Sequence, residues 1–137
     1  MSRELDRFHF QHILHYKMSD DTRLEPLDGR QAQLLKGLAE MALLSLVDER
    51  PHYGLEILDK LRAEAGLSMA EGTVYPLLYR LERARLTHAE WRLEGAGARP
   101  RKYYALTDLG RAELARQLED WRRISKSLGG FLERRYR

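Results

Sequence analysis

Hydroxyl and guanidinium groups gather on one side of the segment GTVYPLLYRLERARL, residues 72–86. At 100° per residue a single stripe predicts a helix with one face toward a core, and it contains Val74, Leu77, Leu78, Leu81 and Ala84. The opposite face or its edge carries Thr73, Tyr75, Tyr79, Arg80 and Arg83. Tyrosine and threonine bond phosphate oxygens, and arginine pairs with phosphate or with guanine. This face therefore suits DNA, with an ordinary surface helix as the alternative.

A second cationic element follows this helix in the sequence. LTHAEWRL and RKYYALT each alternate in polarity, and the turn EGAGARP between them predicts a β-hairpin with a long basic loop. The tip of the hairpin carries Arg99, Arg101 and Lys102. Cations at such a tip can follow phosphates or enter a narrow minor groove. Helix and hairpin together favour DNA binding more strongly than either does alone.

The elements that must position these residues can be predicted from periodicity and capping signals. Helical spacing covers about 31–48 and about 53–65, followed by the tyrosine-bearing helix. After the hairpin, Thr107 is a good N-cap for a long helix from 108 to about 128, which Gly129-Gly130 is expected to break. This order predicts a mainly α protein with a small β-hairpin wing (α+β): a winged helix-turn-helix plus a long C-terminal helix.

The start of the tyrosine-bearing helix has two solutions. Ser68 and Glu71 form an S-x-x-E capping box, which starts the helix near residue 69 and leaves Pro76 inside it. An internal proline removes one backbone hydrogen bond and bends the axis. Alternatively, a start at Thr73 places Pro76 in the first turn, where proline is harmless.

Composition limits the class of protein. The chain has 137 residues, 43% of them hydrophobic and 33% charged, with a net charge of +3, and these values favour a soluble globular protein. No apolar run approaches the ~18 residues of a membrane span, and no signal-peptide pattern opens the chain, so the expected location is the cytoplasm. Cysteine is absent, and no nucleotide-binding or hydrolase motif is present. We therefore expect no catalytic residues, no cofactor and no membrane partner.

The chain divides into three predicted parts: an N-terminal extension over 1–30, the winged helix-turn-helix over 31–107, and a dimerisation helix and tail over 108–137. The extension begins with a short amphipathic helix at 4–17 and continues as a linker. Three of its histidines are spaced by three: His9, His12 and His15. Positions with this spacing drift by about 120° around a helix, so a packing or flexible arm is favoured over a metal site.

The predicted C-terminal helix carries a repeat with alternating steps of four and three residues. Its members are Leu114, Leu118, Trp121, Ser125, Leu128 and Leu132. Such a heptad seam needs a facing surface, and a second copy of the chain supplies one more simply than the same domain does. The seam therefore predicts a homodimer.

Three motifs in register resemble the PadR family of bacterial transcriptional regulators: HYGLEIL at 52–58, GTVYPLLYRLE at 72–82 and RKYYALTDLGRAEL at 101–114. The resemblance covers about residues 34–128. It implies a homodimeric winged-helix DNA-binding protein, usually a repressor. The resemblance implies that Tyr75, Tyr79 and Arg80 contact the DNA bases. It also implies that Arg99, Arg101 and Lys102 bind the phosphate backbone of the DNA.

The resemblance also implies a candidate ligand position. In drug-binding members of the short-tailed PadR group, a tryptophan at the matching place lines a flat pocket at the dimer centre. EDWRRISKSL makes Trp121 the matching residue here. Those members carry a carboxylate one turn later, where this chain has Ser125. An aromatic wedge in the dimer core is therefore favoured over a pocket for a cationic drug.

The sequence as a whole predicts a regulator that binds double-stranded DNA at a pseudo-palindromic promoter or operator, as a homodimer and as a repressor. Its two recognition helices would lie about one DNA turn, ~34 Å, apart. Two alternatives remain open. One is a ligand-responsive regulator that senses a planar small-molecule effector at the dimer interface, and the other is a winged helix used for protein contacts.

Overall fold

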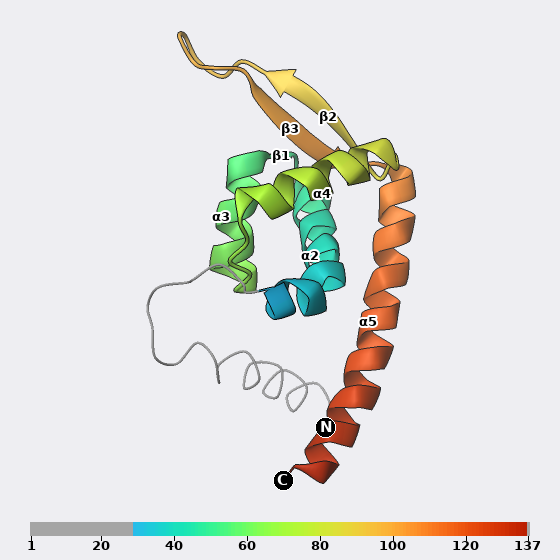
Figure 1. The fold of residues 1–137 in the computed structure, drawn as a ribbon. Coiled ribbons are helices and arrows are strands. Elements are labelled where there is room, and N and C mark those ends of the chain that lie inside the picture. Colours follow the sequence, from blue (N-terminus) through green and yellow to red (C-terminus); the bar gives the residue numbers. More distant parts are fainter. Residues whose placement is uncertain (1–28, 137) are drawn as a thin grey trace. The chain divides into compact units, whose positions relative to one another are not determined.

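The computed structural model describes residues 29–136 of the chain, with side chains from residue 35 onward. The predicted N-terminal helix at 4–17, the histidines beside it and the linker lie outside the described residues. In chain order the elements are α2 (Gly29–Glu49), β1 (His52–Tyr53), α3 (Gly54–Ala65), α4 (Glu71–Arg83), β2 (Thr87–Arg92), β3 (Arg101–Leu106) and α5 (Asp108–Arg135) (Figure 1). The predicted fold class, a winged helix-turn-helix with a long C-terminal helix, is confirmed.

The chain forms two compact units, whose described parts are residues 29–116 and 117–136. Helix α5 begins in the first unit and continues into the second. No helix in the described part is long and apolar enough to cross a membrane.

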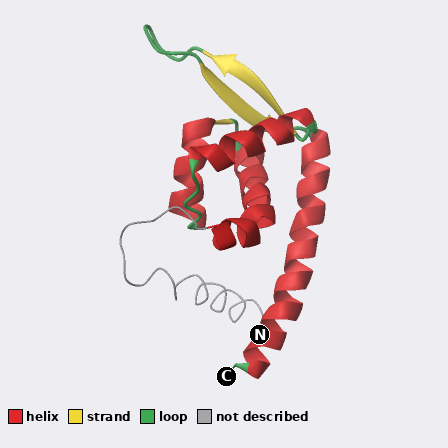
Figure 2. Ribbon diagram, in the orientation of Figure 1, coloured by secondary structure: helices red, strands yellow, loops and turns green. Residues whose placement is uncertain are grey.

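The sheet has three antiparallel strands in the order β1-β3-β2 (Figure 2). Strand β1 pairs Tyr53 with Tyr103, and β2 pairs Trp91 with Lys102 on the other side of β3. The sequence predicted only the two strands of the hairpin and began the second helix at Tyr53. A two-residue strand shows no alternation, and its pairing with β3 is a contact between distant parts of the chain.

The core of the first unit is built from helix faces and closed by β3. The side chains of α2, α3 and α4 that are fully buried include Leu43, Leu44, Ile57, Leu61, Val74, Leu78 and Leu81. Burying each such side chain stabilises the fold by about 1.5–3 kcal/mol. Tyr104 and Leu106 of β3 are also buried. The predicted stripe of α4 is confirmed at its apolar positions, except that Ala84 is exposed because it is the C-cap.

Helix α4 starts between the two predicted positions. Ala70 is its N-cap, with no capping bond from a side chain, and its carbonyl oxygen accepts hydrogen bonds from the amides of Thr73 and Val74 at 3.0 and 3.1 Å. The prediction that Pro76 lies inside the helix is therefore confirmed, and the alternative that placed it in the first turn is wrong. Pro76 lies inside the helix, beyond the first turn, where the ring nitrogen cannot donate the usual bond.

Helix α5 begins where predicted and ends later. Thr107 caps it, because the amide of Gly110 donates to Thr107 Oγ1 at 2.9 Å. The Thr107 hydroxyl also lies 3.0 Å from the carbonyl oxygen of Leu86, which ties the start of α5 to the turn after α4. The expected break at Gly129-Gly130 does not occur, and the helix continues to Arg135. Glycine costs a helix about 1 kcal/mol relative to alanine, which the good helix formers on both sides offset.

Candidate nucleic-acid interface

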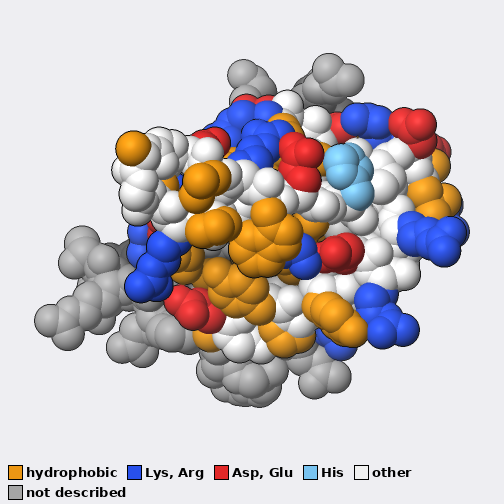
Figure 3. All heavy atoms as spheres, turned by 90° about the horizontal axis from the view of Figure 1, so that it is seen from above, with side chains coloured by type: hydrophobic (Ala, Val, Ile, Leu, Met, Phe, Trp, Pro, Cys, Tyr) orange, Lys and Arg blue, Asp and Glu red, His pale blue; other side chains and the backbone are white. Residues whose placement is uncertain are grey.

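The outer face of α4 is polar and aromatic. Tyr75 and Tyr79 are 41% and 60% exposed, although the leucines on the other side of the same helix are buried. The remaining predicted residues of this helix are exposed as well: Thr73, Arg80 and Arg83. Seen from above, the face that carries α4 and the hairpin gathers hydrophobic side chains at its centre, tyrosine being coloured with them, and has Lys and Arg side chains around them (Figure 3).

Tyr75 lies directly over the first residue of α3. A Cβ atom built on Gly54 would fall 2.7 Å from both Cε1 and Oη of Tyr75. Only glycine leaves room for the ring in this position, because real Cβ contacts are never so short. Burial raises the pKa of Tyr75, and the nearby Glu71 carboxylate raises it further, so the phenol stays protonated at neutral pH and can donate a hydrogen bond. The sequence placed Gly54 in a motif but gave no sign that it seats Tyr75.

Both arginines of α4 are held by neighbours in the same unit. Arg80 Nη2 lies 3.4 Å from Oε2 of Glu40 in α2. Arg83 Nη1 donates to Tyr79 Oη at 3.1 Å, and its guanidinium carbon lies 5.7 Å from the centre of the Tyr79 ring. Exposed pairs of this kind add little to stability. They restrict the side chains, however, and a phosphate or a guanine edge can replace either partner.

The three predicted wing cations have different surroundings. Arg99 is exposed in the loop between the strands, whereas Arg101 and Lys102 open strand β3. The Arg101 guanidinium stacks over the ring of Tyr53, 4.5 Å from its centre. Lys102 Nζ lies 2.9 Å from Oε2 of Glu82, and this hydrogen bond raises the pKa of Lys102. Lys102 therefore joins the hairpin to α4, and it does not lie at the tip as the sequence had suggested.

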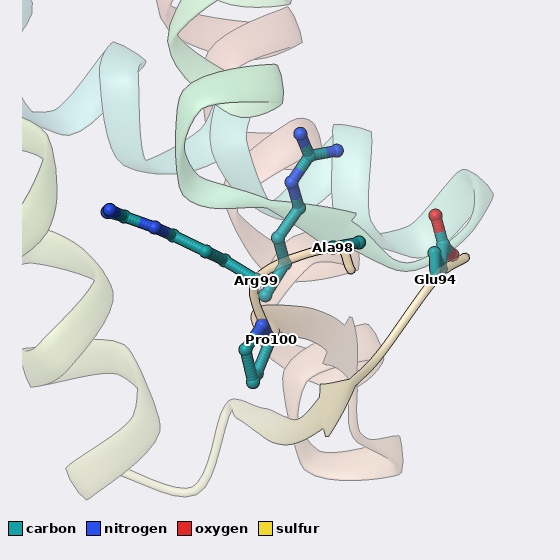
Figure 4. A pocket seen from close by; sticks show the side chains of 5 residues that line it. Glu94, Ala98, Arg99 and Pro100 are labelled. Atoms are coloured by element: carbon teal, nitrogen blue, oxygen red, sulfur yellow. The ribbon is translucent and has the colours of Figure 1, made fainter. Parts of the chain in front are cut away.

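The hairpin loop lines a cavity of about 490 Å³ that is partly open to solvent (Figure 4). It is lined by Glu94, Ala98, Arg99, Pro100 and Arg101. All of these residues lie on or beside a single exposed loop, so the cavity offers no buried polar group for a ligand. In the described residues, no three His, Asp or Glu side chains are grouped so that they could hold a metal ion.

Two exposed apolar residues of the wing were missed as site candidates. Trp91 is 68% exposed and Leu93 is 67% exposed. The sequence assigned both to the side of the hairpin shared with Ala89, and such a pattern usually marks a face toward a core. Trp91 and Leu93 are exposed, contrary to this expectation, because the hairpin extends beyond the core. Only the end of the hairpin away from the loop packs against the helices.

The predicted dimer residues of α5 separate into two groups. Leu114 is 5% exposed and belongs to the chain's own core, so it is not available to a partner. Leu118, Trp121 and Ser125 are half-buried. Leu128 is 52% exposed. An exposed apolar stripe, which we call the α5 stripe, includes Leu128 and three neighbours on the same side of the helix: Ile124, Phe131 and Leu132.

These features define the class of protein: a winged helix-turn-helix in which an exposed helix face and a cationic hairpin belong to one folded unit. The model of the PadR-like family of transcriptional regulators matches residues 43–116, which is more than half of the chain. The chain belongs to this family. It is a transcriptional regulator with a DNA-binding winged helix-turn-helix, and not an enzyme.

Solved structures agree with this assignment. A PadR-like regulator from Bacillus cereus is 30% identical, with a TM-score of 0.66, over 73% of this chain and 96% of that one. A PadR family regulator from Eggerthella lenta is 36% identical, with a TM-score of 0.65, over 74% and 87% of the two chains. An uncharacterised protein of Lysinibacillus sphaericus is 28% identical over 105 residues, which cover 75% of this chain and 95% of that protein.

Proposed function

We propose that this regulator is a repressor that binds a pseudo-palindromic operator in double-stranded DNA as a homodimer, in the bacterial cytoplasm. The observation that carries the proposal is the two-sided character of α4. Val74 and the leucines of its apolar stripe are at most 8% exposed, while two phenols and two guanidinium groups face outward on the other side. Membership of a family whose regulators bind DNA supports DNA as the partner of this face.

In the proposed complex, α4 enters the major groove. Tyr75, Tyr79 and Thr73 bond phosphates or base edges through their hydroxyl groups, and Arg80 and Arg83 exchange their intramolecular partners for phosphate or guanine. Because Glu40 and Tyr79 already restrict these arginines, less side-chain freedom is lost on binding than for free surface arginines.

The wing cations act on the DNA backbone in this proposal. Arg99 and Arg101 neutralise phosphates beside the groove, which contributes affinity without sequence preference. Lys102 has a different task, since its ion pair with Glu82 fixes the angle between hairpin and α4. The wing therefore sets the register in which α4 meets the bases.

The dimer in this proposal is built on α5. The α5 stripe leaves Ile124, Leu128, Phe131 and Leu132 between 37% and 53% exposed in the single chain, and a second copy would cover it. We place Leu118, Trp121 and Ser125 in the same interface, with the Trp121 indole as an aromatic wedge. A two-fold axis would then set the two α4 helices about one DNA turn, ~34 Å, apart. Occupancy of a promoter by this dimer would block transcription.

A gel-shift titration against genomic fragments tests the proposal. We expect one fragment to compete at least ~10²-fold better than bulk DNA at moderate salt. Arg101→Ala should weaken binding to all sequences and flatten the salt dependence, whereas Arg80→Ala should also change which bases are preferred. Binding of every fragment with the affinity of bulk DNA would refute sequence-specific regulation. Equal effects of the two variants on all sequences would refute the division of roles.

A further inference from the structure

Trp91 is the largest exposed apolar side chain of the wing. It lies near the end of β2 and is 68% exposed, although an indole normally contributes more than ~150 Å² of buried surface. Scattered exposed leucines need no explanation, but an exposed tryptophan on a DNA-binding unit is a candidate contact residue.

The strand register determines which way the indole points. Trp91 is paired with Lys102, and paired residues project from the same side of a sheet. Lys102 reaches Glu82 of α4 from that side. The Trp91 side chain therefore projects from the side of the hairpin that is turned toward α4, beyond the part of the hairpin that packs on the core.

The rings on the other side of the sheet are already covered. Arg101 stacks over Tyr53, and the Arg92 guanidinium carbon lies 4.7 Å from the centre of the Tyr103 ring. Within the described part of the chain, no cation or second ring covers Trp91 in this way. Its flat faces and its Nε1–H group are both available to a partner.

We propose that Trp91 contacts the sugar–phosphate backbone of DNA, between the groove that α4 enters and the phosphates that the wing loop approaches. The ring would pack against a deoxyribose, and Nε1–H would donate a hydrogen bond to a phosphate oxygen. Indole offers a donor and no acceptor, and phosphate offers only acceptors. The cations of the wing, Arg99 and Arg101, favour this polyanion over an apolar protein surface. The inference rests on the proposed DNA binding and assigns it a further contact.

The contact has a signature that separates it from the wing cations. Trp91→Ala should lower the affinity about 10-fold for every sequence, because it removes a hydrogen bond to a charged phosphate and the contact of the ring with the sugar. The slope of affinity against salt should not change, because a neutral side chain releases no counterions. Trp91→Phe should lose less, since it keeps a ring and removes only the donor. Leu109→Ala, at a residue that is 58% exposed on α5, is the matched control and should bind like wild type.

Fluorescence gives a second readout, because the chain has only two tryptophans. The emission of the wild-type protein should be quenched as the best-binding fragment is added, and Trp91→Phe, in which emission comes from Trp121 alone, should be quenched much less. Unchanged emission together with wild-type affinity of Trp91→Ala would overturn the inference and leave the proposed function standing. If Trp91→Ala instead dissociates the dimer in sedimentation, Trp91 is a subunit contact and the inference is also wrong. If the wild-type protein binds no fragment in gel shifts, the proposed function itself fails.

Discussion

Helix α4 of the winged-helix unit and the distal part of α5 differ in whether their apolar side chains are buried. In α4, Val74, Leu78 and Leu81 have no exposed surface, and most of the exposed side chains are polar or aromatic. In α5 beyond residue 117, Ile124 and Leu128 are more than half exposed. Helix α4 buries its apolar stripe within one chain, whereas distal α5 presents an apolar stripe that we propose a second copy covers. The two regions should therefore respond differently to the same kind of substitution.

The largest effect is expected in the core of the first unit. Leu78→Ala removes a fully buried side chain and leaves a cavity, so the free energy of unfolding should fall by about 2–5 kcal/mol. Urea denaturation followed by circular dichroism measures this loss. A loss below ~1 kcal/mol would mean that the core of this unit is not closed within the chain.

The same truncation in the α5 stripe should act on association. Leu128→Ala should weaken the dimer by about 10-fold or more, through lost apolar burial, and leave the secondary structure unchanged. The matched control is Lys126→Ala, because Lys126 is two residues before Leu128 and about 160° away from it around the helix. Sedimentation velocity over a dilution series distinguishes the two variants. Equal dimerisation of both would remove the stripe from the interface.

A third variant tests how the first unit shapes its surface. Gly54→Ala puts a methyl group where the Tyr75 ring now lies, so the ring must move away from α3. We expect a 3- to 10-fold loss of affinity for the preferred fragment, about 0.6–1.4 kcal/mol, with little change for bulk DNA. Gel-shift titration of both DNAs measures it. Tyr75→Phe is the companion variant, since it keeps the ring and removes the hydroxyl group.

A smaller, stabilising effect is expected within α5. A Cβ atom at Gly129 would meet no atom within 4 Å, so Gly129→Ala should stabilise the helix by about 0.5–1 kcal/mol through lower entropy of the unfolded chain. Thermal unfolding at a fixed protein concentration measures the gain. If the variant instead weakens the dimer, the glycine lies against the partner helix.

The smallest effect is expected for the ion pair between Arg50, which follows α2, and Glu56 in the first turn of α3. Burial is the largest single influence on Glu56 and would by itself raise its pKa. The hydrogen bond from Arg50 Nη2, 3.1 Å from Oε2, acts with the electrostatic effects of His52 and Arg50 and a backbone hydrogen bond from Tyr53, and together they hold the pKa below its usual value of 4.5. A lowered pKa in the folded state stabilises the protein above pH 4.5, and this contribution is lost as the pH falls through the folded-state value.

Glu56→Gln should therefore be slightly less stable than wild type at neutral pH, and the difference should vanish in acid. Urea denaturation at several pH values between about 3 and 7 measures it. Glu64→Gln, which removes an exposed pair with Lys60, is the control for loss of a surface carboxylate. A difference that persists at the acid end would contradict the assignment to the Arg50 pair.

Much of the fold could be predicted because its signals are local. The stripe of α4 follows from residue spacing, and the Thr107 cap was predicted from a residue type beside a helical pattern. The C-cap at Gly66 is left-handed, with φ of 68°, as glycine after a helix predicts. Each of these features depends on residues within a few positions of one another.

The predictions that were wrong concern features that nearby residues alone do not determine. Strand β1 exists because of its pairing with β3, about fifty residues later, and α5 continues through Gly129 although the local rule predicts an end. Leu114 was assigned to the dimer seam by its spacing, but the chain's own core buries it. Lys102 was placed at the hairpin tip although the predicted strand RKYYALT contains it, and its ion pair with Glu82 of α4 was not predicted because the two residues are distant in the sequence.

The sequence by itself therefore determined the class of this protein, the outward face of α4 and the presence of a wing, since periodicity and motif order are encoded along the chain. The tertiary structure decided which of these side chains act together. It placed the Tyr75 ring over Gly54, joined Lys102 to Glu82, and left Trp91 uncovered on the side of the hairpin turned toward α4. The contacts between Tyr75 and Gly54 and between Lys102 and Glu82 join residues that are distant in the sequence. Only packing of the folded chain brings such residues together.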